Sequence, residues 1–116
     1  MTIQVDVWLR GTDVATTGTL EDITTSPADW RDDDVKHILE GMLRTMHRLK
    51  HRSEPEVVSL RGLSWIVNPF DKGVVIAIEI GLGAAVAGPF EIDKAVLEDM
   101  IGRVLRQAPS TPATTH

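Results

Sequence analysis

Hydrophobic and polar residues alternate along the start of the chain, from Ile3 to Arg10. One side of this stretch carries only aliphatic residues, namely Ile3, Val5, Val7 and Leu9. The other side includes Trp8. Successive side chains of a β-strand point to opposite faces, so this period of two predicts a half-buried strand. The polar segment Gly11–Thr25 then predicts a long loop, with a short edge strand around Thr17–Ile23 as the alternative.

Two later segments follow the helical period. The first is predicted to begin at Asp32–Asp34, because acidic residues favour the positive end of a helix, and to end near Ser53. The second is predicted to begin after Asp93 as N-cap and to end at Ala108-Pro109. Apolar residues recur three and four positions apart in both: Val35, Ile38, Leu39, Met42, Met46 and Leu49, then Val96, Leu97, Met100, Ile101, Val104 and Leu105.

Two apolar runs between these helices predict a pair of strands. Val57–Val67 and Val74–Ile80 flank Asn68–Gly73, a turn-forming cluster typical of a hairpin loop. A hairpin makes the two strands antiparallel. The longer run Val74–Ala87 has Glu79 as its one charged residue in fourteen positions, which predicts that it lies in the core.

Glycines interrupt the end of this run. Gly81 and Gly83 predict a bulge or bend, Ala84–Ala87 is an optional further strand, and Gly88-Pro89 ends it. The element order is then β-α-β-β-(β)-α. The predicted fold class is α+β: a two-layer sandwich in which an antiparallel sheet of 3-4 strands carries two helices on one face.

The predicted middle strands are apolar on both faces. An antiparallel sheet with helices on one side normally shows a polar second face, whereas here that face would carry Trp8 and several aliphatic residues. Large exposed apolar patches are rare on monomers. Either the loop Gly11–Thr25 folds across this face or another chain covers it. We favour a second copy, because symmetric dimers are the commonest closed assembly.

Composition narrows the class of protein. The 116 residues predict one domain over 1–108 and a disordered, Ser/Thr/Pro-rich tail over 109–116. The chain lacks cysteine, shows no signal peptide and has no run long enough to span a bilayer, which predicts a cytoplasmic protein without a membrane partner. Eight arginines against four lysines, and no tyrosine, favour a bacterial or phage origin.

Charge is unevenly distributed in this acidic chain, whose net charge is −5. The net charge argues against nucleic acid as the partner. A basic cluster nevertheless falls at the predicted end of the first helix: Arg44, His47, Arg48, Lys50, His51 and Arg52. It is a candidate for binding an acidic partner or a phosphate backbone, although cations also favour a helix C-terminus without any ligand. His47 and His51 have metal-ligand spacing, but Arg48 replaces the glutamate of H-E-x-x-H, so no metal site is predicted.

Glu79 is the one weak candidate for catalysis. If buried, its carboxyl would serve as a general acid or base, with His47 or His51 supplied by a second copy, whereas pairing with Arg61 would make it structural. No nucleophile or second carboxylate accompanies it. The glycines at 81, 83 and 88 depart from the G-x-G-x-x-G pattern, so no cofactor is predicted.

The leading hypothesis from sequence is a small, non-enzymatic interaction or regulatory protein that forms a homodimer and binds another protein. Trp8 would belong to the dimer interface. Two alternatives stay open: a ligand-binding protein or enzyme that uses Glu79 with His47 or His51, and a nucleic-acid-binding regulator that uses the basic helix end Arg44–Arg52.

Overall fold

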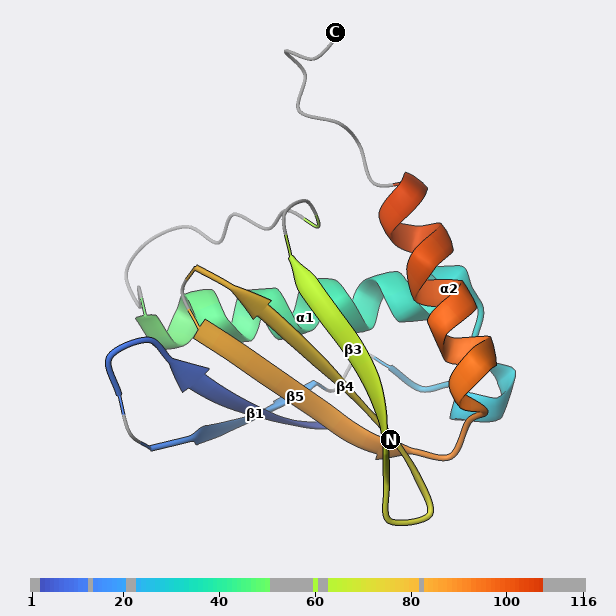
Figure 1. Cartoon of the computed structure of the whole chain (residues 1–116), viewed down its shortest axis with the longest axis horizontal. Helices are drawn as coiled ribbons and strands as arrows, with labels where there is room; N and C mark the ends of the chain where they lie inside the picture. The colour runs from blue at the N-terminus through green and yellow to red at the C-terminus, as the bar shows by residue number, and fades with distance from the viewer. Residues whose placement is uncertain are drawn as a thin grey trace, which may run out of the picture.

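The computed structural model describes residues 3–12, 14–20, 23–50, 60, 63–81 and 83–107. These residues form one five-stranded antiparallel sheet, in the order β2-β1-β5-β4-β3, with α1 lying across one face and α2 packed against α1 and β3 (Figure 1). The elements are β1 (Ile3–Leu9), β2 (Thr16–Leu20), a 3-10 turn (Pro27–Asp29), α1 (Asp32–Lys50), β3 (Ser64–Phe70), β4 (Gly73–Ile80), β5 (Gly83–Phe90) and α2 (Lys94–Gln107). The predicted α+β class with two helices and an antiparallel sheet is confirmed. The predicted count of 3-4 strands and the order β-α-β-β-(β)-α are corrected, because β2 precedes α1.

β2 lies inside the segment predicted to be a loop, at the place of the short edge strand around Thr17–Ile23 that was the alternative prediction. It pairs with β1 in a register that runs from Ile3 opposite Leu20 to Val7 opposite Thr16. Of its five residues only Leu20 is buried. The alternation that reveals a strand depends on one buried face, so a strand with a single buried side chain leaves almost no signal in sequence. Because β2 extends the sheet, residues 16–20 do not cross the face that lies opposite the helices.

β3 begins later and ends later than the apolar run that predicted it. The strand Ser64–Phe70 includes Pro69, and the turn that joins it to β4 is only Asp71-Lys72, with Asp71 in the left-handed region at φ 57°. Proline is tolerated because β3 is an edge strand, where an N–H can be lost without breaking a ladder on both sides. The earlier part of the predicted strand, at 57–59 and 61–62, lies outside the described residues.

β5 is a full central strand and not an optional one. It lies between β1 and β4 and continues through Gly88-Pro89, whose peptide bond is cis, to Phe90. The predicted bend at Gly81 and Gly83 is the turn between β4, which ends at Ile80, and β5, which begins at Gly83. A register shift between Val74 and Ile76 is a further irregularity. Gly83, at φ 153°, lies so close to the Trp8 carbonyl oxygen that a Cβ would overlap it.

The helices bury the stripes that the helical period predicts. The α1 stripe is buried except for Leu49, which is partly buried, and the α2 residues Leu97, Met100, Ile101 and Val104 are buried. Val96 departs from the prediction, since it is 49% exposed. Asp93 caps α2 as predicted, because its carboxylate accepts a hydrogen bond from the Val96 amide at 3.2 Å. The predicted helix end near Ser53 falls outside the described residues.

Candidate interaction surface

The sheet face turned away from α1 and α2, here called the outer face, is crossed by two rows of neighbouring side chains. One row runs over four strands as Ile66, Ala77, Val86 and Asp6. The next row runs as Ser64, Glu79, Ala84 and Trp8. Five of these eight residues are apolar, as the two-sided apolar pattern of the middle strands predicts, and Asp6, Ser64 and Glu79 lie among them.

The outer face has a raised side and a hollow. Trp8, which is 40% exposed, stands on β1 next to Ala84. Ile66, which is 51% exposed, stands on β3 next to Ala77. The small side chains between them leave a hollow of about 330 Å³, bordered by Ser64, Ile66, Ala77, Glu79 and Ala84. A large aromatic side chain therefore stands directly beside a shallow apolar recess.

Glu79 lies on the outer face and is exposed. Its predicted role as a general acid or base required a buried carboxyl, and the Glu79 carboxyl is not buried. Its neighbours in register are Ser64 and Ala84, and the predicted partner Arg61 lies outside the described residues. His47 belongs to α1 on the opposite side of the sheet, and His51 lies outside the described residues. One chain therefore does not bring Glu79 and His47 together.

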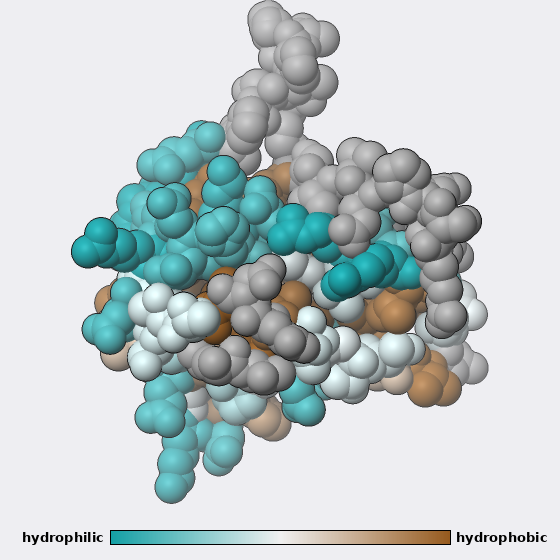
Figure 2. All heavy atoms as spheres, turned by 180° about the vertical axis from the view of Figure 1, so that it is seen from behind, coloured by the Kyte–Doolittle hydropathy of each residue, from teal (hydrophilic) through white to brown (hydrophobic). Residues whose placement is uncertain are grey.

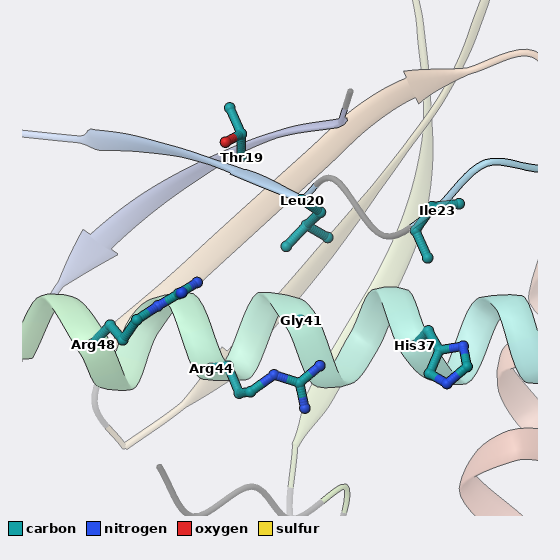
Figure 3. Close-up of a pocket in the computed structure, with 7 residues that line it drawn as sticks. All are labelled: Thr19, Leu20, Ile23, His37, Gly41, Arg44 and Arg48. Carbon is teal, nitrogen blue, oxygen red and sulfur yellow. The ribbon is translucent and has the colours of Figure 1, made fainter. Parts of the chain in front are cut away.

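The basic residues of α1 contribute to a different feature, a groove of about 450 Å³ between α1 and β2 (Figure 3). Its wall on α1 is one helical stripe: His37, Gly41, Arg44 and Arg48. Thr19, Leu20 and Ile23 form the facing wall. The predicted binding residues Arg44 and Arg48 thus meet here, whereas half-buried His47 does not line the groove and His51 and Arg52 lie outside the described residues.

His37 belongs to this groove, although the sequence prediction of a basic site did not include it. His37 lies apart from the cluster in sequence, but His37, Gly41, Arg44 and Arg48 follow the helical spacing that puts residues on one face. The helix-bearing side as a whole is mainly hydrophilic, and hydrophobic residues show in a band across its middle (Figure 2).

The described residues contain no group of three or more His, Cys, Asp or Glu side chains placed to hold a metal ion. In the same part of the chain, neither helix is both long and apolar enough to cross a membrane. A comparison of the chain with models of known protein families, with curated proteins and with solved structures gives no match in any of the three.

Proposed function

We propose that this protein is a non-enzymatic interaction protein that forms a two-fold homodimer through its outer face. The observation that carries the proposal is the group of apolar side chains on the outer face, of which Trp8 and Ile66 are exposed, with Ala77, Ala84 and Val86 on the strands between them. A cytoplasmic location is part of the proposal, since a chain without cysteine needs no oxidising compartment for its stability.

The outer face is large enough for a specific interface. Five strands about 4.8 Å apart, each of about seven residues at about 3.3 Å per residue, cover about 550 Å². Two copies would then bury about 1,100 Å², which lies just above the lower limit of about 1,000 Å² for a biological contact. The proposed dimer is thus of modest size, and its affinity depends on a few well-packed residues.

A two-fold interface requires the same surface to be complementary to itself. Trp8 next to the hollow meets this requirement, because each copy would insert its indole into the hollow of the other. A cavity of about 150 Å³ holds benzene, so about 330 Å³ has room for an indole ring. A buried indole N–H needs an acceptor, and the Glu79 carboxylate at the border of the hollow supplies one.

Sedimentation and light scattering over a concentration series test the dimer. The wild-type chain is expected to reach about twice 12.8 kDa. Trp8→Ala removes the inserted ring, and Ala77→Arg places a charge in the hollow. Each is expected to weaken the dimer about 30-fold or more, because loss of a central aromatic residue typically costs about 2 kcal/mol or more.

Val96→Arg is the matched control, since it also replaces an apolar side chain by arginine but lies exposed on α2, on the other side of the sheet. It is expected to leave the dimer intact. Circular dichroism confirms that each variant is folded. A wild-type chain that stays monomeric at high micromolar concentration, or a folded Ala77→Arg chain that still dimerises, would contradict the proposal.

A further inference from the structure

β2 is an edge strand with one unpaired side. Its single neighbour in the sheet is β1. In an antiparallel pair, alternate residues direct both N–H and C=O toward the neighbour, so the intervening residues of β2 direct theirs away from β1. Within the described residues, no other backbone hydrogen bond reaches these groups. The outward side of β2 is therefore available for another strand.

The sequence of β2 lacks the features that usually protect an exposed edge. Natural edge strands carry lysine, proline or a bulge that prevents pairing with a further strand. The residues Thr16-Thr17-Gly18-Thr19-Leu20 include neither a charge nor a proline. The opposite edge strand, β3, contains Pro69 and is contacted by α2. The two edges of the sheet thus differ, and β2 is the open one.

Among the described residues, the groove beside this open edge is lined by basic side chains from α1 and by apolar ones from the facing wall. Arg48 extends from α1 toward β2, and Arg44 extends along α1 toward His37 (Figure 3). Leu20 and Ile23 supply the apolar part of the lining. None of the described residues that line the groove is acidic. Arg48 also donates to the Thr45 hydroxyl at 3.4 Å.

Close packing fixes the distance between β2 and α1. A Cβ added to Gly41 would lie 2.9 Å from Leu20 Cδ2, and one added to Gly18 would lie 2.8 Å from Thr45 Cγ2. The strand and the helix therefore meet at van der Waals contact at two points along the groove. A groove held in this way loses little conformational entropy when a ligand enters it.

We propose that this groove binds an acidic segment of a partner protein, which adds to β2 as a further antiparallel strand. Backbone hydrogen bonds to β2 would supply affinity, and carboxylates facing Arg44 would supply specificity. Because side chains of a strand alternate, the segment should carry Asp or Glu at every second position. A second copy of β2 is a poor occupant, since two-fold pairing would bring the arginines of both copies together.

Fluorescence anisotropy with labelled synthetic peptides tests this binding on the full chain. A peptide that alternates glutamate and threonine is expected to bind, and its affinity is expected to fall as sodium chloride rises. The same peptide with lysine in place of glutamate is expected not to bind. Arg44→Gln should weaken binding about three- to tenfold, whereas Arg106→Gln, which removes an equal charge from α2, should leave it unchanged.

N-methylation of alternate peptide amides separates strand addition from simple charge attraction without changing the protein. It removes the N–H donors that β2 would bind, so binding is expected to be lost in one of the two alternating patterns. Equal binding by both N-methylated peptides, equal competition by free glutarate, or no binding by the unmodified peptide would each overturn the proposal. Ala77→Arg should bind the peptide normally, because the groove is independent of the outer face.

Discussion

At the scale of single residues, Asp32 shows how a tertiary contact shifts the pKa of a side chain. Arg103 on α2 donates to Asp32 at the start of α1, with Nε 2.9 Å from Oδ2 and Nη2 3.0 Å from Oδ1. These hydrogen bonds, together with the positive charge, lower the pKa of the Asp32 carboxyl below its ordinary value, against a smaller opposing effect of desolvation. The sequence places both residues on helices but does not indicate that they meet.

Arg103→Met is expected to raise the pKa of the Asp32 carboxyl. The pKa is lower in the folded chain than in the unfolded one, so the pair stabilises the fold above the unfolded pKa. That contribution is lost as the pH falls through the folded pKa. The variant should therefore be slightly less stable than wild type at neutral pH and equally stable in strong acid. NMR titration of Asp32 and urea unfolding at both pH values measure the two effects.

Arg106→Met is the control for this pair, because it removes the same charge from the same helix. It should leave the pKa of Asp32 nearly unchanged. An Asp32 carboxyl that titrates at the same pH in the Arg103→Met chain and in the wild type would show that the ion pair does not form in solution.

At the scale of elements, the packing of β2 against α1 decides where the groove lies. Leu20 is the single buried side chain of β2, and it packs directly on Gly41. Gly41 lies within α1, where glycine costs about 1 kcal/mol relative to alanine. Glycine at position 41 therefore lowers the stability of the helix but allows β2 to approach α1 closely.

Gly41→Ala is expected to have opposite effects in two backgrounds. In the native chain its methyl group would press on Leu20, so we expect a loss of about 1 kcal/mol in the free energy of unfolding. Leu20→Ala alone should cost about 2–3 kcal/mol. In the Leu20→Ala chain, Gly41→Ala should instead stabilise by about 1 kcal/mol, because the space is open and alanine favours the helix. Urea unfolding of the four proteins measures this coupling.

Gly102→Ala on α2 is the matched control, since its methyl would meet only the guanidinium end of Arg106. It should be neutral or stabilising by up to about 1 kcal/mol in both backgrounds. Additive effects of Leu20→Ala and Gly41→Ala would mean that β2 does not pack on α1 as the structure shows.

At the scale of the whole molecule, the two faces of the sheet serve different purposes. The inner face packs on α1, α2 packs on α1 and β3, and together they form the core. The outer face carries exposed Trp8 and Ile66 and forms the proposed dimer interface. The groove between β2 and α1 lies at the edge of the sheet, so a dimer through the outer face leaves it accessible. Self-association and partner binding are thus compatible in one molecule.

The proposed dimer makes thermal stability depend on protein concentration. Association that favours the folded state shifts the unfolding midpoint by mass action. We expect a rise of about 2 to 4 °C for each tenfold increase in concentration of the wild-type chain. The midpoint of Ala77→Arg should not change with concentration. Differential scanning calorimetry measures both, and a wild-type midpoint that stays constant would count against self-association.

The sequence by itself determined the elements whose side chains are buried on one side. The period of two in β1 and the helical period of α1 and α2 follow from burial of one face, so a local pattern is enough to predict them. The same reasoning predicted that Trp8 lies opposite the aliphatic side of β1, and the structure places it there, 40% exposed.

Only the tertiary structure decided which segments lie side by side. β2 joins the sheet through backbone hydrogen bonds to β1, and these groups are the same in every residue except proline, so the side-chain pattern does not indicate which strand β2 pairs with. The packing of β2 beside α1 also forms the groove. His37, Arg44 and Arg48 lie on one side of the helix, and they line a groove only because β2 supplies the opposite wall. The order of hydrophobic and polar residues shows which side of an element is buried. It does not show which distant segments come into contact, because those contacts form only when the chain packs.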